Sequence, residues 1–226
     1  MKAALLSDRG IIKISGEPAR HFLNNLVTSD IDHLAPGSSR YAALLTPQGK
    51  IIADFIVIEA AAEDGGGFFL DCPRALVRTL LERLNLYKLR AKIAIEDFSE
   101  GLGVIAVWDG TGTTENGLAY PDPRLPELGF RVIAPAHLAG DIAREIGTTL
   151  TDEAAYEAHR IGLGVPRGGL DFMYGDAFPH DADLDQLGGV DFKKGCYVGQ
   201  EVVSRVEHRG SARTRTTLGS WSRNFR

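Results

Sequence analysis

Short apolar runs separated by turn residues indicate strands in the first sixty residues. Lys2–Leu6 and Ile11–Ile14 flank a polar stretch that ends in Gly10. This pattern predicts a β-hairpin, because glycine readily adopts the positive φ angle that a tight turn requires. A second pair of strands joined by a turn is expected where the pattern recurs, in Arg40–Leu45, Thr46–Gly49 and Lys50–Glu59.

Apolar residues at helical spacing indicate two helices in the first half of the chain. The first begins near Pro18, since the first turn of a helix tolerates proline. Asp71 is placed to cap the second helix, which puts Cys72 in its first turn as a packing residue. The apolar stripes of the two helices consist of Phe22, Leu23, Leu26 and Val27, and of Leu76, Val77, Leu80, Leu81 and Leu84.

The second half of the chain mixes strands and helices without strict alternation. This order predicts an α+β fold rather than a doubly wound parallel sheet. A boundary near residue 98 divides the chain into subdomains 1–98 and 99–203, followed by a basic segment, 204–226. The predicted elements are strands at Leu89–Asp97, Gly103–Trp108 and Phe130–Ala134, and helices at Pro135–Ile146 and Asp152–Ile161.

Composition places the chain among ordinary globular proteins. Its 226 residues are 44% hydrophobic and 24% charged, with a formal net charge of −5. These values exclude collagen-like, disordered and strongly nucleic-acid-binding classes. The length permits one large domain or two small ones, and we expect two.

Cysteine usage and hydropathy bear on the cellular location. Two cysteines are too few for a secreted disulfide framework, so a reducing compartment is expected. The first ten residues reach Asp8 and Arg9 before a signal-peptide core could form. The longest apolar stretch, Ile51–Ala62, contains Asp54 and Glu59 and is too short to span a bilayer. We therefore predict a cytoplasmic protein without a membrane partner.

Motifs for nucleotides and metals fail on inspection. The chain has no complete G-x-G-x-x-G fingerprint and no phosphate-binding P-loop. Asp181, Asp183 and Asp185 imitate the first calcium ligands of an EF-hand, but Gln186 and Phe192 stand where glycine and glutamate are required. We interpret these aspartates as a solvated acidic loop. The six histidines show no ligand spacing, so no metal site is expected.

Positive charge is concentrated at the end of the chain. Ser204–Arg226 contains six arginines and one acidic residue, Glu207, a local balance of +5 that leaves −10 for the rest. Two interpretations stand here: a solvated terminus, or an anion-attracting segment beside Lys193–Glu201.

The segment Leu187–Glu201 carries the most informative chemistry. Cys196 lies between Gly195 and Gly199, which permit close approach of a ligand to the backbone. Lys193 and Lys194 precede it, and their charge would favour the thiolate form. Judged on spacing alone, an inert thiol in a tight turn is the favoured interpretation, because spacing does not establish geometry.

Lys194–Glu201 reads KGCYVGQE and resembles the K-G-C-Y-x-G-Q-E signature of the YgfZ/IBA57 family. This family comprises folate-binding proteins of iron–sulfur cluster maturation that are related to the glycine-cleavage T-protein. Further blocks resemble the family in the same order, at Phe22–Asp30, Leu45–Lys50, Arg83–Arg90 and Arg160–Pro166.

The resemblance implies a fold, a cofactor and a set of site residues. Two mixed α/β subdomains would surround a central cleft that binds tetrahydrofolate. A C-terminal β-barrel domain, present in relatives, is expected to be absent or truncated here. Cys196 and Lys194 are the implied catalytic pair, with Lys194 lowering the pKa of the thiol. The implied cofactor-binding residues are Tyr197, Gly199, Gln200, Glu201, Asn25, Asp54 and Arg160.

Three functions follow from the resemblance. The first is a folate-dependent accessory factor for maturation or repair of [4Fe–4S] proteins, with the iron–sulfur machinery or its client proteins as partners. The second is an aminomethyltransferase like the T-protein. It is disfavoured because T-proteins carry paired aspartates where this chain has Ala53-Asp54, and a glutamate where it has Gly162. The third is a folate-binding adaptor without chemistry of its own, so whether the protein is an enzyme stays open.

Overall fold

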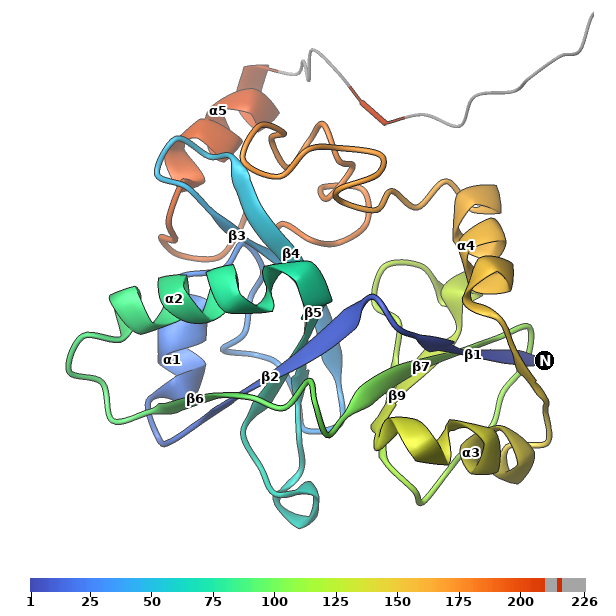
Figure 1. Ribbon diagram of the computed structural model, residues 1–226. Coiled ribbons are helices and arrows are strands. Elements are labelled where there is room, and N and C mark those ends of the chain that lie inside the picture. Colours follow the sequence, from blue (N-terminus) through green and yellow to red (C-terminus); the bar gives the residue numbers. More distant parts are fainter. Residues whose placement is uncertain (210–214, 217–226) are drawn as a thin grey trace, which may run out of the picture.

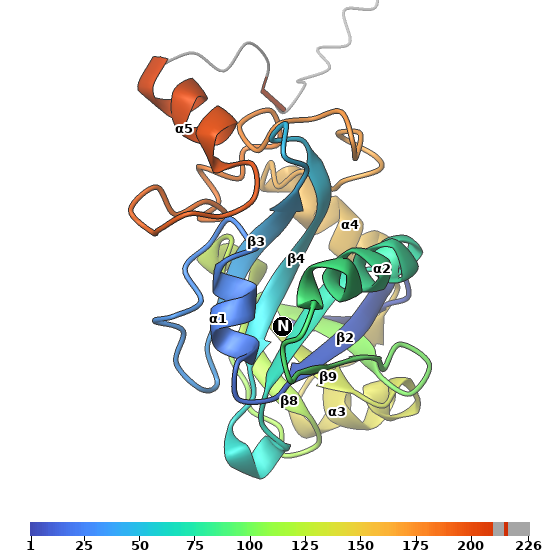
Figure 2. The ribbon, with the colours of Figure 1, turned by 90° about the vertical axis from the view of Figure 1, so that its left-hand side faces the viewer.

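The structure, a computed structural model, describes residues 1–209 and 215–216. Its strands form two five-stranded sheets that face each other across one apolar core (Figures 1 and 2). The N-terminal sheet is antiparallel throughout. Its strand order is β3 (Ser39–Leu45), β4 (Ile51–Glu59), β5 (Phe68–Pro73), β2 (Arg9–Ser15) and β6 (Ala94–Asp97).

The second sheet contains β1, the first strand of the chain. Its strand pairs are antiparallel except for β1 and β10, which run parallel. The order is β10 (Leu150–Thr151), β1 (Lys2–Leu6), β7 (Gly103–Trp108), β9 (Phe130–Ala134) and β8 (Leu118–Pro121).

Helices cover the outer faces of both sheets because alternate residues of each strand point to opposite sides. In β4, Phe55 and Val57 pack with the helices of the N-terminal sheet, whereas Ile56 and Ile58 enter the core between the sheets. The helices are α1 (Ala19–Asn24) and α2 (Val77–Lys88) on the N-terminal sheet, α3 (Ala139–Glu145) on the second sheet, and α4 (Glu153–Gly162) and α5 (Gln200–Arg209) further along the chain. Four short 3-10 helices lie at 62–64, 74–76, 126–128 and 136–138.

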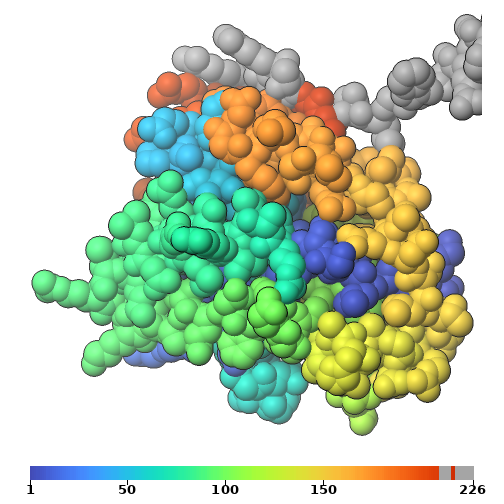
Figure 3. Space-filling model, viewed as in Figure 1, coloured from blue at the N-terminus to red at the C-terminus, as the bar shows by residue number. Residues whose placement is uncertain are grey.

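An irregular segment, residues 163–199, connects α4 to α5 and returns to the N-terminal sheet. Figure 3 shows it in orange against the cyan residues of the β3–β4 region. The backbone N–H of Ile51 donates to the carbonyl of Ala177 at 3.0 Å, and Gly175 donates to Ile51 at 2.7 Å. Thr28 donates through its hydroxyl to the carbonyl of Gly189. These bonds fix a segment that has no regular secondary structure of its own.

The α+β fold class predicted from the sequence is confirmed, but the predicted first hairpin is wrong. Strands β1 and β2 lie in different sheets and do not pair. The cause is burial on both faces of β1: Ala3 packs with α3, whereas Ala4 and Leu6 enter the core between the sheets. Such a strand needs neighbours on both edges, and β7 and β10 supply them. The subdomain boundary near residue 98 stays a prediction.

The predicted helix cap at Asp71 is also wrong. Asp71 and Cys72 are fully buried in strand β5, and the helix starts at Val77. Burial raises the pKa of the Cys72 thiol to about 12, so this sulfur is protonated at neutral pH. No helix among the described residues is long and apolar enough to cross a membrane.

Asp71 belongs to a buried ionic network between the sheets. The guanidinium of Arg131, on β9, contacts Asp71 at 2.5 Å and Asp122 at 3.0 Å. Arg9 contacts the other oxygen of Asp71 at 2.6 Å. Burial by itself would raise the pKa of Asp71, but the charges of Arg9 and Arg131 outweigh it and hold that pKa below its usual value.

Removing one charged residue of this network should lower the free energy of unfolding strongly. We expect Arg131→Met to lower the free energy of unfolding by about 3–5 kcal/mol, because it leaves buried carboxylates without their counter-charge. Arg78→Met is the matched control, since Arg78 is exposed and pairs with the exposed Glu82 along α2; it should cost less than about 0.5 kcal/mol. Urea unfolding at pH 7 measures both variants. Equal, small losses would contradict the network's role.

The same network should make the free energy of unfolding fall at low pH. The pKa values of Asp71 and Asp122 are lower in the folded state than the value of about 3.9 in unfolded chains. Their contribution is therefore fully present above about pH 4 and is lost as the pH falls through the folded-state values. Wild-type stability should fall more steeply below pH 4 than that of Arg131→Met, measured by urea unfolding across pH. Parallel curves would contradict this assignment.

Candidate functional site

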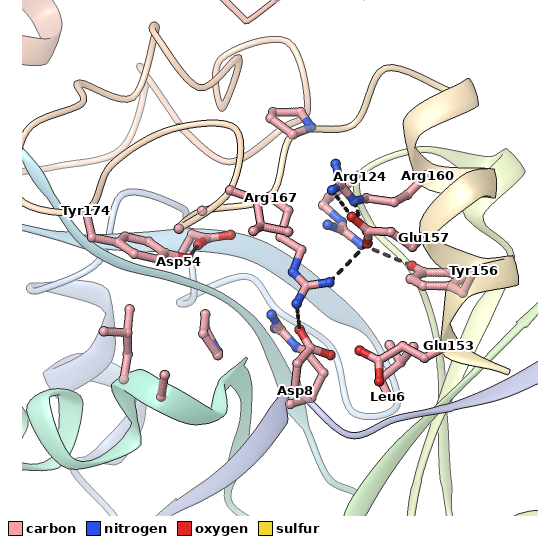
Figure 4. A pocket seen from close by; sticks show the side chains of 18 of the residues that line it. Leu6, Asp8, Asp54, Arg124, Glu153, Tyr156, Glu157, Arg160, Arg167 and Tyr174 are labelled. Carbon is pink, nitrogen blue, oxygen red and sulfur yellow. Dashed lines mark hydrogen bonds and ion pairs between the residues drawn. The ribbon is translucent and has the colours of Figure 1, made fainter.

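A central cavity of about 270 Å³ lies where the two sheets, α4 and the segment after α4 meet. Figure 4 shows its lining side chains, with Asp54 and Tyr174 at one end and Tyr156, Glu157 and Arg160 at the other. The apolar part of the wall comes from Leu6, Pro73, Ala75, Leu76, Pro166 and Leu170.

Asp54, on β4, is the buried carboxylate at one end of the cavity. It is 6% exposed, and each of its oxygens accepts a hydrogen bond from a tyrosine. Tyr41 donates to Oδ2 at 2.8 Å, and Tyr174 donates to Oδ1. An ionised carboxylate offers about four acceptor positions, so Asp54 keeps capacity for a donor inside the cavity.

Arginines and acids line the opposite end of the cavity. Arg160, on α4, is 5% exposed and contacts both Glu157 and Asp171. Arg167 reaches across the cavity, as the dashed lines in Figure 4 show, and contacts Glu157 at 3.0 Å and Asp8 at 3.1 Å. Each positive charge here already has a carboxylate partner, so the wall is polar but locally balanced.

The signature segment Lys194–Glu201 lies elsewhere, against α1 and the β3–β4 turn. The ammonium of Lys194 donates to three backbone carbonyls, those of Asn24, Val27 and Ser29, at 2.6–2.8 Å. It also lies 5.2 Å from the centre of the Tyr197 ring. Burial lowers the pKa of Lys194 to about 8, although the nearby carboxylate of Asp30 opposes this shift.

Gly199 fastens the other end of the signature segment. Its φ of +84° favours glycine, and a Cβ at this position would lie 2.6 Å from the carbonyl oxygen of Thr46. The facing residue, Gly49, also has a positive φ, and a Cβ there would lie 2.9 Å from Val202. Two glycines therefore allow the β3–β4 turn to approach the start of α5.

Cys196 lies exposed between these two attachments. Tyr197 is buried next to it, and burial raises the pKa of its hydroxyl to about 12. Gln200 and Glu201 form the first turn of α5. The acidification of Cys196 by Lys194 stays a prediction, because the contacts of the Lys194 ammonium are made with carbonyl oxygens.

The structure separates the predicted site residues into three places. Asp54 and Arg160 line the central cavity, and no described residue of 187–201 does so. Asn25 lies in a different groove, between α1 and the residues that follow α2, where its amide contacts His21 at 2.9 Å. The structure therefore does not bring the signature segment, Asn25 and the cavity residues together in one cavity. Their individual folate contacts stay predictions.

The predicted solvated acidic loop is wrong for one of its members. Asp183 is 8% exposed, and Arg215 contacts it at 3.0 Å and Asp185 at 2.8 Å. The arginine supplies the counter-charge that makes burial of Asp183 tolerable. The remaining arginines of the basic segment beyond residue 209 lie outside the described residues, so both interpretations of that segment stay open.

The same region gathers groups that bind metals in other proteins. Ligand atoms of His180, Asp185 and Glu207 lie within 4.8 Å of one another. The guanidinium of Arg215 already binds Asp185, so this arrangement carries no metal assignment.

Sequence reasoning identified Asp54 and Arg160 but missed Tyr174 and Arg131, which also line the cavity. Tyr174 lies 120 residues from Asp54, and Arg131 lies 60 residues from Asp71. The polar residue Asp54 inside an apolar strand was the available signal, because a carboxylate at a buried position requires partners.

Comparison with known proteins agrees with the fold and with the signature. A family model described as the GCVT N-terminal domain matches residues 6–159. The chain also resembles a crystal structure of glycine cleavage system aminomethyltransferase T from Bartonella henselae, with a TM-score of 0.73 and 18% identity over 92% of this chain and 63% of that one. At this identity the likeness concerns the fold.

Curated relatives are named iron–sulfur cluster assembly factor IBA57 homologues. The protein of Mycosarcoma maydis is 34% identical over 95% of this chain and 56% of its own length. That of Pyricularia oryzae is 33% identical over 93% of this chain and 55% of its own length. The chain thus spans about half the length of these relatives.

The names of these relatives also describe them as mitochondrial, which contradicts the prediction of a cytoplasmic location. That prediction rested on cysteine usage and on the first residues, and neither distinguishes between reducing compartments. On the combined evidence of fold, signature and relatives, the chain belongs to the family of the IBA57 homologues and contains a GCVT N-terminal domain.

Proposed function

We propose that this protein is an iron–sulfur cluster assembly factor that acts through the thiol of Cys196. The relatives are named for such a role, and the signature segment is the part of the chain whose residue types suit it. One cysteine is too few to hold a cluster alone, since clusters generally require four protein ligands. A partner that supplies the other ligands is therefore part of the proposal.

The observation that carries this proposal is the attachment of the signature segment on both sides of its cysteine. Lys194 is held by three carbonyls two residues before Cys196, and Gly199 is packed against Thr46 three residues after it. Cys196 stays exposed between them. A thiol fixed at the surface by rigid neighbours is available to a partner without reorganising the fold.

We further propose that the central cavity binds tetrahydrofolate. The lining suits the pterin ring, because Asp54 offers acceptor capacity, Leu6 and Leu76 supply apolar surface, and the aromatic ring of Tyr156 lies at the end opposite Asp54. Tetrahydrofolate would supply a reduced pterin able to carry one-carbon groups. The part of this chain is to orient the pterin edge through Asp54 and to shield it from water.

Aminomethyl transfer is not favoured by any contact in the cavity. The block Arg160–Gly164 has glycine at position 162, where the T-protein block has a glutamate, and a Cβ at Gly162 would meet no atom within 4 Å. The chain therefore offers no carboxylate at this position.

Replacing the thiol tests the role of Cys196. In cells that lack the native copy, we expect Cys196→Ser to reduce the activity of a [4Fe–4S] enzyme at least tenfold relative to wild type, because serine cannot ligate or exchange sulfur as a thiolate does. Arg78→Met is the control, since Arg78 is exposed on α2 and lies outside the signature segment. Full rescue by the serine variant would contradict the role of the thiol and favour a folate-binding adaptor.

Removing the Lys194 ammonium should loosen the signature segment. We expect Lys194→Met to lower the free energy of unfolding by about 1–3 kcal/mol, because three carbonyls lose a charged donor. Lys193→Met should change it by less than about 0.5 kcal/mol. Urea unfolding measures the stability, and proteolysis near residue 196 reports the local loosening. If both variants match wild type, the attachment through Lys194 is unimportant.

A further inference from the structure

Two tyrosines bind the carboxylate of Asp54, and they differ in how they are held. Tyr41 belongs to strand β3, is 2% exposed and donates to Oδ2 at 2.8 Å. Tyr174 belongs to the irregular segment after α4, is half-buried and donates to Oδ1. Strand β3 fixes the first hydroxyl, whereas the second belongs to a partly exposed side chain on a segment without regular secondary structure.

The ring of Tyr174 takes up room at the wall of the cavity. It lies against Gly168, where a Cβ would overlap the ring, and it forms a T-shaped pair with the ring of Phe172, with ring centres 5.4 Å apart. The cavity measures about 270 Å³. This is below the roughly 300–1,000 Å³ that pockets for drug-sized ligands occupy. Displacement of the Tyr174 ring would enlarge the cavity beside Asp54.

We propose that Tyr174 is a displaceable gate, whose hydroxyl occupies on Asp54 the position that the pterin edge takes when tetrahydrofolate enters. This inference rests on the proposed folate site. The side chain of Tyr174 leads the movement, and its contact with Asp54 holds closed a segment whose backbone bonds are those of Gly175, which donates to the carbonyl of Ile51 at 2.7 Å, and of Gly169, which donates to that of Phe172 at 2.8 Å. When the hydroxyl leaves Asp54, the backbone over residues 168–174 should open more often.

If Tyr174 is a gate, removing the hydroxyl of Tyr41 and removing that of Tyr174 should change the affinity for tetrahydrofolate in opposite directions. Tyr41 binds Asp54 in both the closed and the liganded state and orients the carboxylate. Tyr174 binds Asp54 in the closed state and is displaced by the ligand. Removing an interaction that exists only in the unliganded state shifts the population toward the binding-competent state and strengthens binding.

Calorimetric titration with tetrahydrofolate separates these roles. Tyr174→Phe should bind about tenfold more tightly than wild type, equivalent to 1.4 kcal/mol. Tyr41→Phe should bind about tenfold more weakly. Binding by Tyr174→Phe that is equal to or weaker than wild type would overturn the gate, because Tyr174 would then belong to the wall that holds the ligand.

A steric variant tests the gate while keeping the tyrosine hydroxyl. Gly168→Ala places a methyl group where the Tyr174 ring now lies, so it should also tighten binding. Gly162→Ala is the matched control, because its added methyl group meets no atom within 4 Å, and its affinity should equal that of wild type. Unchanged affinity in Gly168→Ala would count against displacement of the ring.

A measurement without ligand distinguishes failure of the gate from failure of the folate site. In the absence of folate, amide hydrogen exchange over residues 168–174 should be faster in Tyr174→Phe and Gly168→Ala than in wild type or Gly162→Ala. If exchange is faster but no variant binds tetrahydrofolate, the folate assignment is overturned. The hydrogen bond between Tyr174 and Asp54 would then still hold the segment closed. Unchanged exchange would show that the contact of Tyr174 with Asp54 does not hold this segment closed, and would overturn the gate.

Discussion

A buried ion pair between Arg131 on β9 and Asp71 on β5 sets the relation between the two sheets. A buried carboxylate and guanidinium tolerate little displacement, because each must keep its hydrogen-bond partners. Arg9 and Tyr120 complete the shell around Asp71. The pair thereby fixes the distance between β5 and β9, and side chains from β4 and α4 face one another across the space that becomes the central cavity. The charges of Arg9 and Arg131 line that cavity in turn.

The close approach of Gly49 and Gly199 is a second constraint, and it joins two family blocks far apart in the sequence. Without side chains at these positions, the β3–β4 turn supports the first turn of α5, and Lys194 ties the same segment to the end of α1. The result is a division of labour. An exposed thiol lies in a segment anchored at both ends, while the cavity proposed to bind the pterin lies in the interior between the sheets. A ligand in the cavity and a partner at the thiol, as proposed, would therefore not compete for space.

The sequence predicts most strands well, because buried antiparallel strands such as Gly103–Trp108 and Phe130–Ala134 are short apolar runs bounded by turns. It also yields the signature residues, since their spacing is characteristic. Asp71 illustrates what local patterns do not predict. A polar residue after an apolar run is typical of a helix cap, but the partner of Asp71 is Arg131, 60 residues later in the chain. The position of β1 depends likewise on β7 and β10, and the hydrogen bond from Tyr174 to Asp54 joins residues 120 positions apart.

The folate site and its orientation by Asp54 form the centre of this account. The most direct test is calorimetric titration of tetrahydrofolate into wild type and Asp54→Asn, a substitution that keeps the shape of the side chain but removes its charge. We expect one site per chain in wild type and at least tenfold weaker binding in the variant, since hydrogen bonds to a charged group contribute about 1.5–3 kcal/mol. Equal affinities, or no binding by wild type, would contradict the account.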